Sequence, residues 1–200
     1  MNNLDPKNIF KEIVITGFGG QGIVLAGKIL GQAAALGDHM ESTLIQSYGP
    51  ESRGGACSAQ VIISDSPISY PYVRSADILA AMSQGGYEKY VGMLKKDGIL
   101  IVDPDLVAPK ASEKEYVAIP STRMAEEMGR KMMANIIMIG CITAVTRAVT
   151  LEAARQAVSV SVPKGTEEMN VKAFNKGHDY GMAVLKSRQK KAAGITGASS

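Results

Sequence analysis

Short runs of apolar residues alternate with segments of helical spacing along much of the chain. Runs at residues 12–16, 77–82 and 99–102 are rich in Ile, Val, Leu and Ala, and a small or polar residue follows each of them. Because consecutive positions are apolar, we expect these strands to be buried on both faces of a parallel sheet. Further strands are expected at residues 43–47, 57–64 and 116–120.

Between Gln21 and Leu36 the apolar residues recur on one side of a helix, and Gly37 follows at the position where helices often end. A helical pattern also begins after Ser121, which is a candidate N-cap. Further helices are expected at residues 86–94, 132–148, 152–158 and 167–188. Strands that alternate with helices predict an α/β fold with helices on both faces of the sheet. Residues 38–77 hold strands and no helix, so we expect a mostly parallel but mixed sheet.

The composition is that of an ordinary globular domain. The 200 residues are 46% hydrophobic and 20% charged, which excludes a disordered chain, a collagen and a coiled coil. No uncharged run, that at residues 132–146 included, is as long as the roughly 20 residues that a membrane span needs. The N-terminus has no apolar signal region. We therefore expect one cytoplasmic domain without a membrane span.

Cysteine and histidine are scarce. Cys57 and Cys141 form no CxxC motif, and two thiols cannot supply the four that an iron–sulfur cluster usually needs. His39 and His178 each stand beside an aspartate and are expected on the surface or in packing, not as general bases. We expect no metal, and no cofactor held by this chain alone.

Positive charge is concentrated near the C-terminus. The formal net charge is +3, and four of the cations are Lys186, Arg188, Lys190 and Lys191. Such a run is usually a solvated tail, with an acidic partner or a nucleic acid as the alternative. The small residues that follow it have little apolar mass. The sequence therefore predicts a body over residues 1–185 and a flexible tail over residues 186–200, with no nucleic-acid partner.

A glycine-rich turn is the strongest local motif. Residues 17–22 read Gly-Phe-Gly-Gly-Gln-Gly and fit GxGxxG through Gly17, Gly19 and Gly22, between a buried strand and a helix. Such glycines allow a tight turn and a close approach by a ligand, and the N–H groups at the helix start favour an anion. Gly20 and the polar Gln21 exceed what strand–helix packing alone needs, although packing remains the alternative. The motif predicts a Rossmann-like three-layer sandwich.

A dinucleotide site would need an acidic residue at the end of the second strand, about 20 residues further on. Glu41 precedes that strand, which ends at Ser47 and Tyr48. The NAD interpretation is therefore weakened. A stand-alone nucleotide- or dinucleotide-binding module stays open as an alternative function.

A second loop follows the strand that ends at Ser47. Residues 47–55 read Ser-Tyr-Gly-Pro-Glu-Ser-Arg-Gly-Gly, and we expect them at the same edge of the sheet as the glycine-rich turn. Arg53 could bind a phosphate or carboxylate, and Glu51 could pair with it or orient a ligand. An ordinary surface turn and a subunit contact remain alternatives. The candidate binding residues in this loop are Ser47, Tyr48, Glu51, Arg53, Gly54 and Gly55.

Other candidates are fewer. Asn135 enters an otherwise apolar helix, either as an N-cap for the helix from Ile136 or as a site residue. The chain has no nucleophile elbow and no GxxxxGK[ST] loop, and no catalytic residue is assigned.

Together these motifs resemble the gamma subunit of 2-oxoacid:ferredoxin oxidoreductases. The resemblance rests on the glycine-rich turn, the loop over residues 47–55, residues 68–71, Ala76-Asp77 and Asn135. It covers roughly residues 10–185 and is strongest toward enzymes of the 2-oxoglutarate or branched-chain ketoacid type. It implies a single gamma-type domain over residues 1–185.

The resemblance also implies a hetero-oligomeric enzyme with alpha, beta and ferredoxin-like delta subunits. Such an enzyme decarboxylates a 2-oxoacid oxidatively, transfers the acyl group to coenzyme A and passes electrons to ferredoxin. Thiamine diphosphate and the iron–sulfur clusters would belong to the other subunits. We expect this chain to help position coenzyme A and close the active site, and to show no turnover alone. A purely structural assembly subunit is the remaining alternative.

Overall fold

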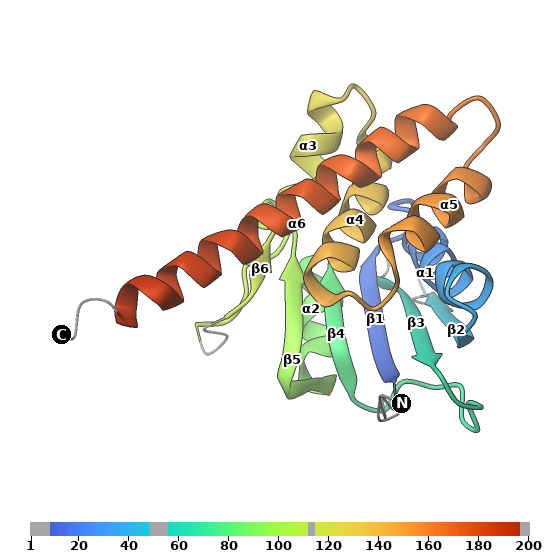
Figure 1. The fold of residues 1–200 in the computed structure, drawn as a ribbon, viewed down its shortest axis with the longest axis horizontal. Helices are drawn as coiled ribbons and strands as arrows, with labels where there is room; N and C mark the ends of the chain where they lie inside the picture. The colour runs from blue at the N-terminus through green and yellow to red at the C-terminus, as the bar shows by residue number, and fades with distance from the viewer. Residues whose placement is uncertain (1–8, 49–55, 112–114, 197–200) are drawn as a thin grey trace, which may run out of the picture.

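A computed structural model describes residues 9–48, 56–111 and 115–196 (Figure 1). Its strands are β1 (Phe10–Phe18), β2 (Glu41–Tyr48), β3 (Ala56–Ser64), β4 (Ala76–Ala81), β5 (Leu94–Val102) and β6 (Val117–Ala118). Its α-helices are α1 (Ile23–Gln32), α2 (Gln84–Tyr90), α3 (Ser121–Glu127), α4 (Ala134–Thr146), α5 (Leu151–Ser161) and α6 (Glu167–Thr196). Every expected strand is present, although β6 pairs over two residues only.

The sheet has the order β2-β3-β1-β4-β5-β6. β1, β4, β5 and β6 run parallel, whereas β3 is antiparallel to both of its neighbours, β1 and β2. The predicted mixed α/β sheet is confirmed. Because β3 is antiparallel to both β1 and β2, these two strands point the same way, and their carboxyl ends meet at one edge of the sheet.

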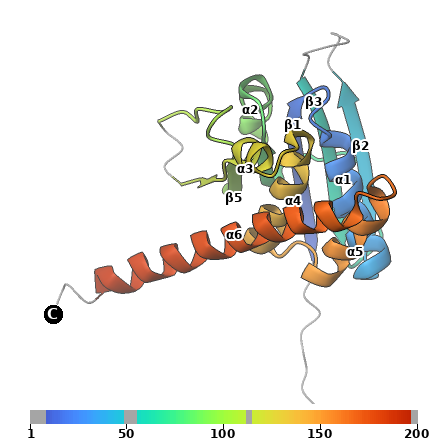
Figure 2. The same ribbon diagram turned by 90° about the horizontal axis from the view of Figure 1, so that it is seen from above.

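Helices cover both faces of the sheet. Ile13 and Ile15 of β1 belong to the core beneath α1, α4, α5 and α6, whereas Val14 faces a second core that includes Tyr87 and Tyr90 of α2. Figures 1 and 2 show these layers, with α2 on the face of the sheet opposite to α1, α4, α5 and α6. Both faces of β1 are therefore buried, which explains why its apolar residues are consecutive.

The centre of α4 is buried on all sides because it lies between the sheet and α6. From Ala134 to Ala144 every residue is buried. Gly140 of α4 and Gly177 of α6 leave no room for a Cβ, because each faces the backbone of the other helix. Ala173 and Phe174 of α6 are also fully buried. The apolar run that was too short for a membrane span is thus the central helix of the core, and no helix in the described parts of the chain is long and apolar enough to cross a membrane.

Two expectations at element ends are wrong. The last helix was expected to end at residue 188, but α6 continues to Thr196 and so includes residues 186–196 of the predicted tail. Ser121 is the first residue of α3 and not its N-cap, a position held by Pro120. The buried Asp103 carboxylate serves this helix start instead, since it accepts the Ser121 hydroxyl at 2.7 Å and the Thr122 N–H at 2.8 Å.

Candidate functional site

The two sequence motifs begin at one edge of the sheet. In the strand register Gly17 lies opposite Cys57, and Cys57 lies opposite Tyr48. β3 therefore starts between the end of β1, which leads into the glycine-rich turn, and the end of β2, which leads into the second loop. Ser47 is half-buried, and the side chain of Tyr48 is exposed and donates from its hydroxyl to Gln46 Oε1 at 3.1 Å. Glu51, Arg53, Gly54 and Gly55 lie outside the described residues.

The glycines of the turn have two different roles. Gly20 and Gly22 adopt positive φ angles of 96° and 71°, which other residues rarely take. At Gly17 an added Cβ would collide with the side chains of Gln21 and Ile23, so this glycine serves packing. At Gly19 and Gly20 no atom of the described residues lies within 4 Å of such an atom, and both residues are exposed. Within the part of the chain that the structure describes, the tip of the turn is therefore open to close approach.

The side chain of Gln21 holds the turn in place. Its Oε1 accepts the Phe18 N–H at 2.6 Å, and its Nε2 donates to the Met82 carbonyl at the end of β4, at 3.1 Å. Both ends of the amide are thereby used inside the chain. Gln21, a candidate binding residue in the sequence, is thus placed to position the turn.

Asn135 joins the glycine-rich turn to α4. It is 2% exposed, its Nδ2 donates to the Gly22 carbonyl at 3.0 Å, and its Oδ1 accepts the Ile136 N–H at 2.9 Å. The expected N-cap role is wrong in position, because α4 begins at Ala134 and its N-cap is Met133. The alternative, a place at the site, agrees with the contact to Gly22.

The first turn of α1 faces this edge without a side-chain cap. Its N-cap is Gly22, no side chain among the described residues caps its free N–H groups, and no acidic residue stands in its first turn. The positive end of the helix dipole is thus available to an anion beside the open tip of the turn.

A hollow of about 360 Å³ adjoins the turn. Gly20, Gly22 and Asn135 line it, and so do residues that the sequence analysis did not single out. These include Arg130, Lys131, Met132, Met133, Thr166 and Asn170. Lys131 pairs with Glu126 at 3.2 Å, and Met132 is 83% exposed. Met133 also lines the hollow although it is only 4% exposed.

Neither cysteine has the character of a nucleophile. Burial raises the pKa of the Cys57 thiol, and it raises the pKa of Cys141 to about 12. Both thiols are therefore protonated at neutral pH. Among the described residues no group of three or more His, Cys, Asp or Glu side chains could hold a metal ion. Glu41 stands at the start of β2 and hence at the opposite end of that strand from the turn, where it could not hold a ribose.

Comparison with known proteins points to one family. The model of the pyruvate ferredoxin/flavodoxin oxidoreductase family matches residues 12–180. The chain is 50% identical over 174 residues to the 2-oxoglutarate synthase subunit KorC of Methanocaldococcus jannaschii, covering 84% of this chain and 92% of that protein.

Two solved structures share the fold. The gamma subunit of a keto/oxoacid ferredoxin oxidoreductase from Geobacter sulfurreducens superposes with a TM-score of 0.76 at 39% identity, covering 86% of this chain and 99% of that one. The 2-oxoglutarate:ferredoxin oxidoreductase of Magnetococcus marinus, determined with 2-oxoglutarate, coenzyme A and succinyl-CoA, gives a TM-score of 0.78 at 22% identity. That match covers 87% of this chain and 31% of the other.

Proposed function

This chain belongs to the pyruvate ferredoxin/flavodoxin oxidoreductase family, and from that premise we propose that it is the gamma subunit of a 2-oxoglutarate:ferredoxin oxidoreductase that positions coenzyme A. On this proposal the complex oxidatively decarboxylates 2-oxoglutarate and transfers the acyl group to the coenzyme A thiol, while electrons pass to ferredoxin. Thiamine diphosphate and the iron–sulfur clusters reside in other subunits. The proposed substrate follows from the identity to KorC.

The observation that carries the proposal is the open tip of the glycine-rich turn beside the uncapped start of α1. Coenzyme A is long and carries several phosphates. Gly19 and Gly20 leave space for close approach, the α1 N–H groups suit an anion, and Arg130 adds positive charge at the neighbouring hollow. The hollow also offers apolar surface from Leu25 and Ile136. The donor set thus fits an anionic ligand with an apolar portion.

Positioning is sufficient to account for a large rate effect. Holding a thiol in the correct orientation next to an acyl intermediate replaces a bimolecular encounter, and such orientation can contribute about 7–11 kcal/mol to lowering a barrier. No general base is required of this chain. Closure of the active site would follow when the bound coenzyme draws the two loops toward the neighbouring subunits.

The test is the Gly19→Val substitution in the assembled complex. Gly19 has room for a side chain and no positive φ, so the variant should fold normally while its side chain fills the space above the turn. We expect the KM for coenzyme A to rise about tenfold or more, with formation of the decarboxylated intermediate unchanged. Arg53→Ala should also raise the KM for coenzyme A, because we expect this arginine to bind a phosphate of the coenzyme.

Gly92→Val is the matched control, since Gly92 is equally open and lies at the opposite end of the sheet, before β5. It should leave the KM for coenzyme A unchanged. If Gly19→Val or Arg53→Ala instead abolishes decarboxylation with coenzyme A affinity intact, the loops belong to the thiamine site. If either substitution prevents the subunits from assembling, the result would favour the alternative that this chain is a purely structural subunit.

A further inference from the structure

The C-terminal part of α6 leaves the body of the molecule. We call residues 182–191 the arm. Gly181 is still buried against Ala144 and Cys141 of α4, whereas residues 186–191 are all exposed. Figure 2 shows the helix continuing past the sheet while the rest of the chain lies to one side. The match to the family model ends at residue 180, just before the arm begins.

The arm carries positive charge only. It contains Lys186, Arg188, Lys190 and Lys191, and no acidic residue follows Asp179. The rest of the chain has 18 basic and 19 acidic residues, so the arm accounts for the net positive charge. Lys186 and Lys190 are four residues apart and repel each other on one side of the helix. Both lysines lie more than one turn before the end of α6, so the helix dipole offsets little of that repulsion, and the exposed residues 186–191 gain little from packing.

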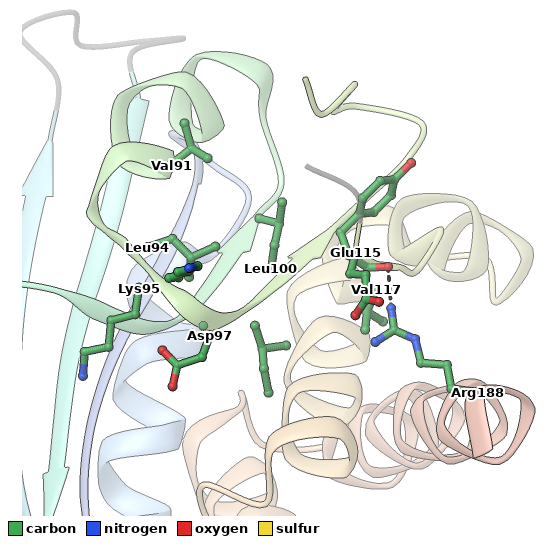
Figure 3. Close-up of a pocket in the computed structure, with 12 residues that line it drawn as sticks. Val91, Leu94, Lys95, Asp97, Leu100, Glu115, Val117 and Arg188 are labelled. Carbon is green, nitrogen blue, oxygen red and sulfur yellow. Dashed lines mark hydrogen bonds between the residues drawn. The ribbon is translucent and has the colours of Figure 1, made fainter. Parts of the chain in front are cut away.

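A groove of about 600 Å³ runs between the arm and the sheet edge (Figure 3). Arg188 forms one wall and donates to the Tyr116 carbonyl at 2.8 Å, which fixes the arm against the chain segment that enters β6. Val91, Leu94 and Ile99 provide partly exposed apolar surface in the groove, and Leu100 and Val117 lie almost fully buried beneath it.

The charges of the groove itself nearly balance. Lys95 is engaged by Asp77 at 2.8 Å and by Glu12 at 3.7 Å, which leaves Lys96 and Arg188 beside Asp97 and Glu115. The excess of positive charge therefore belongs to the exposed face of the arm. A complementary surface would be acidic along the arm and apolar where it meets the groove.

We propose that the arm and this groove dock an acidic surface of another subunit of the complex, with an apolar side chain of that subunit entering the groove. Carboxylates placed along the arm would relieve the repulsion between its lysines and stabilise the exposed helix. The inference rests on the chain acting as a subunit, and it is independent of coenzyme A binding at the glycine-rich turn.

The test measures binding of the full-length chain to the remaining subunits, purified as a complex without it. Fluorescence anisotropy of the chain labelled at its N-terminus gives the Kd at low and at high salt. We expect the triple variant Lys186→Gln, Lys190→Gln, Lys191→Gln to bind about tenfold more weakly at low salt, with the difference shrinking as salt screens the charges. The KM for coenzyme A in the saturated complex should not change, which separates this result from a failure of the proposed function.

Two controls isolate the arm. Lys11→Gln, Lys28→Gln, Lys89→Gln removes the same charge from exposed lysines elsewhere and should leave the Kd within about twofold. Replacing the three arm lysines by arginine keeps the charge and should restore binding. Equal binding by the glutamine variant of the arm, or equal weakening by the control, would overturn the proposal. So would arm-dependent binding of duplex DNA or anionic vesicles with an unchanged subunit Kd.

Discussion

At the scale of single residues, the site depends on a contact between Gly22 and Asn135, which are 113 positions apart. Gly22 has a φ of 71°, and a Cβ there would collide with the Asn135 amide. The Gly22 carbonyl accepts both the Ala26 N–H and the Asn135 Nδ2, at 3.0 Å each. Position 22 therefore requires glycine for two reasons, the positive φ angle and the lack of space beside Asn135. The sequence identified both residues as candidates, but their contact depends on how α4 packs beside α1.

Gly22→Ala should destabilise the protein through both effects. The left-handed backbone angle alone costs about 1–2 kcal/mol, and the collision with Asn135 adds to that. In an Asn135→Ala background the collision is gone, so the same substitution should cost measurably less than in the wild type. Urea unfolding of the two single variants and the double variant measures this difference. Additive losses would show that Asn135 does not constrain the turn.

At the scale of elements, the crossing of α4 and α6 depends on glycine. The backbone carbonyl of Ile137 occupies the place where a side chain at Gly177 would lie, and Phe174 does the same at Gly140. The two helices can therefore approach until their backbones touch, which buries α4 from Ala134 to Ala144. This close contact gives α6 a fixed base from which the arm extends.

Gly177→Ala should separate the two helices. Because the obstructing atoms are backbone and cannot move aside, we expect a loss of about 3 kcal/mol or more in the free energy of unfolding. Gly194→Ala in the same helix meets nothing within 4 Å and should be neutral or slightly stabilising, since alanine favours helix. Thermal unfolding of both variants checks this. A wild-type midpoint for Gly177→Ala would contradict the close packing.

The helices and strands were predictable from the sequence where burial makes their residues apolar, and their bounds were less predictable where the residues are exposed. The strands were recognisable because the centre of β1, most of β4 and the end of β5 are buried on both faces and therefore consecutively apolar. Residues 186–200 were predicted as a tail because they are basic and then small, with little apolar mass. Lys, Arg, Gln and Ala are nevertheless strong helix formers, and they continue α6 once its first half is anchored on α4.

At the scale of the whole molecule, strand direction explains the site. The two loops were expected at one edge because they follow strands of a parallel sheet. In the structure their strands do point the same way, but only because the antiparallel β3 lies between them. The hollow beside the turn was not predictable, since residues 130–133 and 166–170 reach it through the packing of helices that share no motif.

The chain has the features of a subunit and lacks the groups that electron transfer would need. The two cysteines of the chain are too few for an iron–sulfur cluster, and both are protonated by burial at neutral pH. The isolated chain should therefore reduce neither ferredoxin nor a viologen dye when given 2-oxoglutarate and coenzyme A. Adding it to the remaining subunits should restore coenzyme A-dependent dye reduction, measured by absorbance, and Gly19→Val should restore it only at raised coenzyme A. Turnover by the isolated chain would contradict the proposal that it positions coenzyme A while other subunits carry out decarboxylation and electron transfer.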